Sequence, residues 1–272
     1  PVAAGQTETP PANAASSSWQ DAEYVKAFTA GGNCIKEGRI DEAIAHFTES
    51  IRLNPDKFWL SHFERGNAYR SKGECDRAIA DYTSVLQIDP TVIAAYFERG
   101  NTYLSKGEYD RAIADYTSVL QIDPTVVAAY YLRGSIYRGL DQKDNAIADF
   151  THAIQLNPNE SSYYLERGNT YPNDSNTAAI ADYTKAIQLN PALAEAYGFR
   201  GAAYFREGDM AKARADLEHC LQINPDNEMF AGLLNTVLKN ANKQSGMSAA
   251  CARCGAPLEA GEIFCANCGA RR

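Results

Sequence analysis

The sequence predicts an all-α protein in which pairs of helices stack into a solenoid, followed by a small separate module. Three observations lead to this prediction. A repeat of about 34 residues runs through the chain, each copy has the apolar spacing of two helices, and two pairs of cysteines follow the last copy. Since one helical pair cannot bury its own apolar stripe, neighbouring pairs must stack to form a core.

The repeat is clearest in residues 64–97 and 98–131, which differ at only five of 34 positions. The rest of the chain aligns with these two segments as six copies at about 24–57, 59–92, 93–126, 127–160, 161–193 and 194–226, within residues 21–226. Each copy has a glycine, an alanine and a proline at matching positions. The glycines are Gly31, Gly66, Gly100, Gly134, Gly168 and Gly201, the alanines Ala43, Ala78, Ala112, Ala146, Ala179 and Ala213, and the prolines Pro55, Pro90, Pro124, Pro158, Pro191 and Pro225.

Each copy is expected to contain two helices. In the third copy the first helix is predicted at Ala94–Lys106, stopping at Gly107, and the second at Asp110–Gln121, where apolar residues recur three and four apart. An Asp-Pro or Asn-Pro pair then ends the second helix, because the residue before proline is pushed out of the helical conformation. Small residues in the glycine and alanine columns allow the paired helices to approach closely.

The columns of Gly, Tyr, Ala, aromatic and Pro resemble the tetratricopeptide repeat (TPR) family over residues 24–226. The resemblance implies a right-handed TPR α-solenoid of six helix-turn-helix repeats, with a concave face lined by the first helix of each repeat. That face would bind a protein or peptide segment.

Two repeats depart from the pattern. The first has Cys34 where the others have tyrosine, and the fifth is one residue short, with Pro172 where its first helix should continue. Proline inside a helix removes a hydrogen bond and clashes with the preceding turn. We therefore expect that helix to end at about Tyr171, with Asn173–Asn176 forming a longer turn.

The segments that flank the repeats have different compositions. Residues 1–20 contain mainly small residues and proline and are expected to be a disordered tail. Residues 227–242 place apolar side chains on one helical face, which fits the capping helix that a solenoid needs at its end. Residues 243–250 are small and polar and are expected to form a flexible linker.

Four cysteines in two C-x-x-C pairs occupy the last segment, residues 251–270. Two such turns supply four thiolates, the ligand set of a structural tetrahedral metal site, and only Leu258, Ile263 and Phe264 are available as a core. The segment resembles the short zinc ribbon found at the ends of many prokaryotic proteins, which implies one structural Zn²⁺. A pair of redox motifs is the alternative. The expected ligands are Cys251, Cys254, Cys265 and Cys268.

Three cysteines, Cys34, Cys75 and Cys220, remain inside the repeats and are expected to be free thiols. Unpaired thiols and a metal site favour a reducing cytoplasm. The alternative is an exported protein, if a segment ahead of Pro1 carried a signal. No stretch approaches the roughly 18 apolar residues of a membrane span.

The chemistry of the chain argues against several functions. The net charge of −8 disfavours broad binding to nucleic-acid phosphates. The four histidines occur in no catalytic spacing, and Asp110, Asp115 and Asp149 are expected on solvated helix surfaces, so we expect a protein that is not an enzyme.

The first helices contain the residues expected to line a peptide-binding groove. Carboxamides can satisfy the backbone of an extended peptide, aromatic rings can anchor it, and arginines add charge complementarity. The alternative is that these columns mainly support helix packing. The candidate residues are Asn67, Asn101, Ser135 and Asn169, then Phe63, Phe97, Tyr131 and Leu165, with Arg70 and Arg138. Phe28 and Gly32 stand where chaperone-binding TPR domains have a Lys and Asn clamp, so that subtype is not supported.

The sequence therefore favours a non-enzymatic scaffold or adaptor that holds a protein segment in the TPR groove, with the zinc ribbon as a second contact. Two alternatives are kept. One is a regulator that contacts nucleic acid through the ribbon and its Arg253, Arg271 and Arg272, although nucleic acid is the less favoured partner. The other is a self-assembling structural protein.

Overall fold

The computed structural model describes residues 22–54, 59–172 and 175–246, with side chains as far as residue 241. Over these ranges the chain forms thirteen α-helices and no strand. The four cysteines of the expected zinc ribbon and the expected disordered tail lie outside the described residues.

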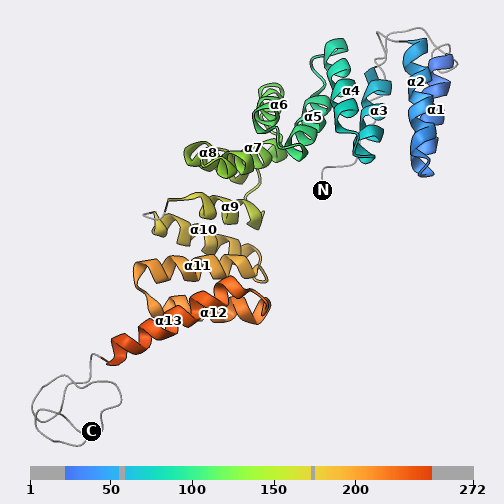
Figure 1. Cartoon of the computed structure of the whole chain (residues 1–272). Coiled ribbons are helices and arrows are strands. Elements are labelled where there is room, and N and C mark those ends of the chain that lie inside the picture. Colours follow the sequence, from blue (N-terminus) through green and yellow to red (C-terminus); the bar gives the residue numbers. More distant parts are fainter. Residues whose placement is uncertain (1–21, 55–58, 173–174, 247–272) are drawn as a thin grey trace, which may run out of the picture. The chain divides into compact units, whose positions relative to one another are not determined.

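The chain divides into two units, residues 1–129 and 130–272, with α7 at the division. Within the first unit each helix packs against the next one along the chain, from α1 to α6 (Figure 1). These helices are α1 (Glu23–Lys36), α2 (Ile40–Leu53), α3 (Trp59–Ser71), α4 (Cys75–Ile88), α5 (Ile93–Ser105) and α6 (Tyr109–Ile122).

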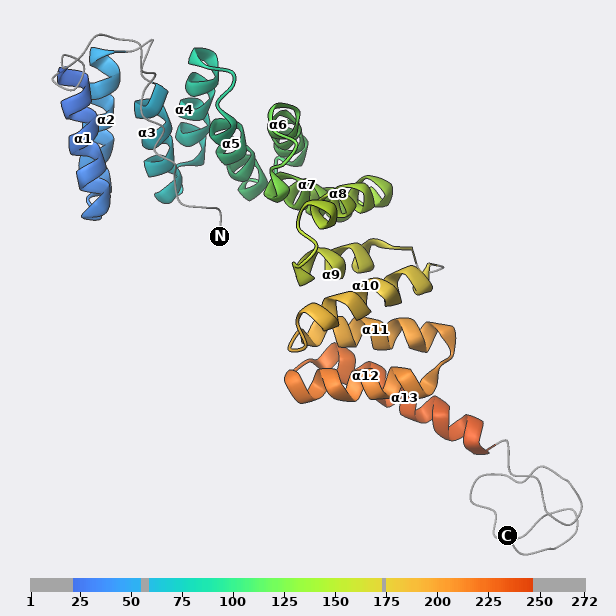
Figure 2. The same ribbon diagram turned by 180° about the vertical axis from the view of Figure 1, so that it is seen from behind.

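The second unit repeats the arrangement from α8 onward, and α9 to α13 stack in chain order in both views (Figures 1 and 2). Its helices are α7 (Val127–Gly139), α8 (Lys143–Leu156), α9 (Ser161–Thr170), α10 (Asn176–Leu189), α11 (Ala194–Glu207), α12 (Met210–Ile223) and α13 (Glu228–Gly246).

The turn inside each repeat explains the glycine that follows the first helix. Gly107 has a φ of 74°, which favours glycine, and its N–H donates to the carbonyl of Leu104 at 3.0 Å. In the fourth repeat Asp141 takes this place with a φ of 57°. Aspartate is one of the few other residues that tolerate the left-handed region.

The glycine column inside the first helices marks their closest approach to the second helices. A Cβ atom on Gly66 would lie 2.9 Å from the Tyr82 ring, and one on Gly100 would lie 3.0 Å from the Tyr116 ring. Both rings are fully buried. The expectation that small residues permit close packing here is confirmed.

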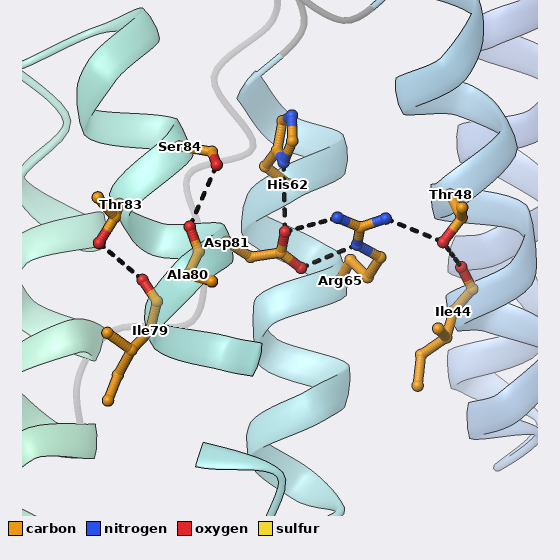
Figure 3. Close-up of polar contacts among 9 residues, drawn as sticks. All are labelled: Ile44, Thr48, His62, Arg65, Ile79, Ala80, Asp81, Thr83 and Ser84. Carbon is orange, nitrogen blue, oxygen red and sulfur yellow. Dashed lines mark hydrogen bonds and ion pairs between the residues drawn. The ribbon is translucent and has the colours of Figure 1, made fainter. Parts of the chain in front are cut away.

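In four repeats a largely buried arginine connects three helices. In Figure 3, Arg65 of α3 donates two hydrogen bonds to Asp81 of α4, at 2.8 and 2.7 Å. Its remaining nitrogen donates to the Thr48 hydroxyl of α2, in the preceding repeat, at 3.0 Å. That hydroxyl donates to the carbonyl of Ile44. We call this Arg–Asp–Thr arrangement the brace.

The bidentate part of the brace recurs in five repeats, with N–O distances of 2.7–2.9 Å. The pairs are Arg65–Asp81, Arg99–Asp115, Arg133–Asp149, Arg167–Asp182 and Arg200–Asp216. The threonine contact is seen for Arg65, Arg99, Arg167 and Arg200, with Thr48, Thr83, Thr151 and Thr184. The first repeat has Ala30 and His46 at the corresponding positions.

The aspartates of the brace are not where the sequence analysis expected them. Asp115 and Asp149 are each 4% exposed, so they do not lie on solvated surfaces. Their charge is kept in the interior because a guanidinium meets both carboxylate oxygens. At Asp115 burial raises the carboxyl pKa despite the opposing effect of Arg99, whereas at Asp81 Arg65 and His62 together outweigh burial and the pKa lies below its usual value.

The fifth repeat and the end of the solenoid differ from regular geometry. Helix α9 ends at Thr170, close to the expected Tyr171, and α10 begins at Asn176. At the end of the second unit, α13 buries Phe230 and Val237 against α11 and α12, as a capping helix should. Helix α13 continues to Gly246, four residues into the expected linker, because Lys243 and Gln244 are good helix formers.

The three remaining cysteines are free, as expected. Cys34 and Cys220 are buried in the hydrophobic cores of their own units, and Cys75 is partly buried at the start of α4. Burial raises the pKa of the Cys220 thiol.

We predict that Asp115→Ala destabilises the protein by about 3–5 kcal/mol, because it leaves the Arg99 charge buried without a carboxylate. Adding Arg99→Met should recover part of that loss, because the orphaned charge is removed as well. Urea unfolding followed by circular dichroism measures both. Asp110→Ala, at an exposed position of the same helix, is the control and should change little. A loss for Asp115→Ala no larger than for the control would contradict the structural role of the brace.

Candidate binding face

The candidate binding face consists of partly exposed side chains at matching positions of the first helices. These helices are α3 and α5 in the first unit and α7, α9 and α11 in the second. We call this face the first-helix face and describe it for each unit separately. The candidate residues on it are half-buried, apart from Arg70 and Arg138, which are exposed.

The predicted asparagines are bonded to buried tyrosines of the second helices. The Tyr82 hydroxyl donates to Asn67 Oδ1 at 2.8 Å, and the Tyr116 hydroxyl donates to Asn101 Oδ1 at 2.7 Å. The Tyr183 hydroxyl donates to Asn169 in the same way at 3.0 Å. Burial raises the pKa of Tyr82 to about 12. Each asparagine therefore satisfies a phenol that has little access to water.

The residue at the asparagine position changes together with the residue opposite it. Where the second helix has phenylalanine or leucine, which carry no hydroxyl, the first helix has a smaller residue. These pairs are Gly32 with Phe47, Ser135 with Phe150 and Ala202 with Leu217. Ser135 donates instead to the Tyr131 carbonyl. The column thus has a packing role, the alternative weighed from the sequence.

Glutamates that the sequence analysis did not single out also line this face. Asn67 Nδ2 lies 3.4 Å from Glu64 Oε2, and Asn101 Nδ2 lies 3.3 Å from Glu98 Oε2. Burial raises the pKa of Glu64, although Asn67 opposes the shift. The repeated segment Glu-Arg-Gly-Asn could have revealed these glutamates from the sequence. It contains the glutamate, the brace arginine, the column glycine and the asparagine in a row.

The predicted aromatic residues each contact a buried ring of their own repeat. The ring centroids of Phe63 and Tyr82 are 5.8 Å apart, and those of Phe97 and Tyr116 are also 5.8 Å apart. Tyr131 lies 5.4 Å from Tyr163 of the next repeat. Leu165 packs against the hydrophobic core around Tyr164. One side of each ring is therefore used in packing, and the other side contributes to the half-exposed face.

The two predicted arginines join neighbouring first helices. Arg70 Nη2 of α3 lies 3.4 Å from Glu98 Oε2 of α5, and Arg138 Nη2 of α7 lies 3.0 Å from Glu166 Oε2 of α9. Successive first helices thus lie beside one another in each unit, as the groove prediction requires. The charge on this face is mixed, since each arginine has a glutamate beside it.

A recess of about 290 Å³ opens on the first-helix face of the second unit, at the irregular fifth repeat. It is lined by residues of α7, α10 and α11 and by the end of α9 with Tyr171 and Pro172. Among the lining residues, Arg138 and Asn169 belong to the predicted set, whereas Arg206 and Phe199 were not predicted.

Sequence models of the tetratricopeptide repeat match residues 28–57, 66–107, 100–141, 127–160 and 194–227, which together cover more than half of the chain. The chain belongs to the tetratricopeptide repeat family. The family resemblance stated from the sequence is thereby confirmed for the repeats. No curated protein sequence matches the chain.

Solved structures support the same assignment. The crystal structure of the MamA protein is 30% identical, with a TM-score of 0.58, over 61% of this TPR chain and 92% of that protein. YrrB, described as a TPR protein with an unusual peptide-binding site, is 25% identical over 70% and 97% of the two chains, with a TM-score of 0.63. The C-terminal part of a TPR repeat-containing protein from Cytophaga hutchinsonii is 20% identical over 80% and 85%, with a TM-score of 0.64, and shows the fold alone.

Among the helices of the described part, none has the length and apolar content that crossing a membrane requires.

We predict that Asn67→Ala destabilises the protein by about 1–3 kcal/mol, because it leaves the buried Tyr82 hydroxyl without an acceptor. In a Tyr82→Phe background the same change should cost much less, because no hydroxyl remains to be satisfied. The coupling free energy from the double-mutant cycle, measured by urea unfolding, tests this. Ser135→Ala, opposite Phe150, is the matched control and should show no such dependence when Phe150 is changed to leucine. A coupling near zero for Asn67 and Tyr82 would show that the column does not serve the phenols.

Proposed function

We propose that this TPR protein is a non-enzymatic scaffold that binds an extended protein segment on its first-helix face. The observation that carries the proposal lies in the first unit, where the half-exposed rings of Phe63 and Phe97 on the successive first helices α3 and α5 stand among amide and charged groups. Such a surface offers apolar contact area together with hydrogen-bonding groups for a peptide backbone. YrrB, the solved TPR protein with 25% identity, is described as having a peptide-binding site, which supports the same class of function here.

The asparagines of this face also accept hydrogen bonds from buried tyrosines, so a binding test must separate affinity from stability. Replacing Asn67 and Asn101 alone would also orphan two tyrosine hydroxyls, so a loss of binding could come from a loss of stability. Replacing each tyrosine by phenylalanine in the same protein removes that problem. The Tyr82→Phe/Tyr116→Phe protein, which keeps both asparagines, is then the matched control.

We expect the protein with both asparagines changed to alanine in this phenylalanine background to bind peptides about tenfold more weakly than the control, a loss of about 1.4 kcal/mol. The probes are acetylated, amidated peptides selected on an array with the unmodified full chain, and affinity is measured by fluorescence anisotropy. Urea midpoints of the two proteins should agree. Equal affinities would remove the asparagines from the binding site, and an array that yields no binding peptide would overturn the proposed function.

We further propose that Cys251, Cys254, Cys265 and Cys268 hold one structural Zn²⁺ in a C-terminal ribbon that acts as a second contact module. The donor set supports this, because four thiolates complete a tetrahedral site and leave no open position for catalysis. Metal binding would supply the folding free energy of so short a segment.

Metal analysis of reduced full-length protein is expected to give about one zinc per chain. Cys251→Ser with Cys254→Ser should abolish it, because two thiolates cannot complete the site. Cys75→Ser, which changes a cysteine of the repeats, is the control and should retain the metal. Protein that carries no zinc after purification and reconstitution under reducing conditions would refute the ribbon.

A further inference from the structure

Two glutamates of the first unit, Glu64 of α3 and Glu98 of α5, stand at the same position of the first-helix face, two residues before the column glycine. Glu98 Oε2 lies 3.4 Å from Arg70 Nη2 of the preceding first helix. The position of α1 that matches Arg70, four residues after the column glycine, is Ile35. Because an aliphatic side chain cannot pair with a carboxylate, the register that provides Glu98 with a cation provides none for Glu64.

The carboxylate of Glu64 has a single polar contact within the part of the chain that the structure describes. Asn67 Nδ2 lies 3.4 Å from its Oε2, at the long end of the hydrogen-bond range. Its Oε1 has no hydrogen-bond partner there and is accessible to solvent. Burial raises the pKa of this carboxyl, because the charge loses water without gaining a cation. A half-buried carboxylate in this state is stabilised by a positively charged partner.

The first repeat stacks on the second in the same register as the second stacks on the third. At both junctions the brace arginine lies 3.0 Å from the threonine hydroxyl of the preceding repeat. Ile35 therefore takes the place beside Glu64 that Arg70 takes beside Glu98. What differs between the two junctions is the chemistry of that neighbour, since Ile35 is apolar and exposed.

The surroundings of Glu64 suit a long basic side chain. At the asparagine position the first repeat has Gly32, and a Cβ atom placed there would have no described atom of another helix within 4 Å. Ile35 and the half-buried ring of Phe63 provide apolar surface near this open space. Lysine and arginine lay their methylene groups along such surface while the charged end meets an oppositely charged group.

We propose that Glu64 binds a lysine or arginine side chain within an extended protein segment, and this rests on the proposed peptide-binding function. The ammonium or guanidinium group donates to Glu64 Oε1, and its methylene groups contact Ile35. The net charge of −8 also attracts a basic segment to the chain as a whole. Because Glu98 is already paired with Arg70, the basic residue is selected at one point of the bound segment.

The test uses the full chain and the acetylated, amidated peptides of the array, in which blocked ends restrict positive charge to side chains. Peptides selected by the unmodified protein should be enriched in Lys and Arg at one position. Changing that residue to Gln should weaken binding about tenfold. In the Glu64→Gln protein the same exchange should leave the affinity nearly unchanged, because no carboxylate remains to distinguish the two peptides.

Ile35→Arg provides a second test, which leaves Glu64 in place. The introduced guanidinium should pair with Glu64 as Arg70 pairs with Glu98. Preference for the basic peptide residue should then be lost, while the urea midpoint should not fall. Ile35→Gln adds a polar side chain without a charge, so it is the control for this change and should keep the preference.

Asp110→Asn is the control for charge, because it removes one negative charge at an exposed position of α6, outside the first-helix face. It should keep the preference for the basic residue. Binding peptides without Lys or Arg enrichment, or equal discrimination between Lys and Gln by Glu64→Gln and the unmodified protein, would overturn the role of Glu64 and leave the proposed function standing. An array with no binding peptide would overturn both.

Discussion

The architecture depends on a largely buried guanidinium at the point where three helices meet. Arg65 ties the two helices of its own repeat through Asp81 and reaches back to Thr48 of the previous repeat, so one side chain fixes both contacts that a solenoid needs. The two hydrogen bonds of this bidentate pair compensate for the desolvation of both charges. The first repeat has Ala30 and His46 in these places, and within the described residues no helix comes before its first helix, α1.

The regular polar columns are therefore largely used by the fold. The brace uses an arginine and an aspartate. Where the second helix has a tyrosine, the asparagine accepts a hydrogen bond from its buried hydroxyl. What distinguishes one part of the first-helix face from another is the set of positions that vary between repeats. Four residues after the column glycine, for example, stand Arg70, Leu104, Arg138 and Pro172. Specificity in this protein is expected at such positions, because identical repeats present identical surfaces.

The difference between local rules and contacts of distant residues explains what the sequence could predict. Helix ends, the capping helix and the early stop at Pro172 follow from local rules that act within a few residues. The burial of Asp115 does not, because its partner Arg99 is 16 residues away and a single aspartate on a helix usually faces water. Reading the copies against one another would have found it, since Arg and Asp recur together in five repeats and are both absent from the first. The recess needed the structure, because its lining comes from four helices.

The brace also explains how the fifth repeat tolerates its shortened helix. Arg167, Asp182 and Thr151 make the same contacts as in regular repeats, and Arg167 lies one residue before Gly168, ahead of the missing turn. Helix α9 is therefore fixed to both neighbours along the part that remains. Pro172 removes only the turn that would follow these contacts. A repeat held at its centre is free to change at its end, and in this chain the recess of the second unit lies at that end.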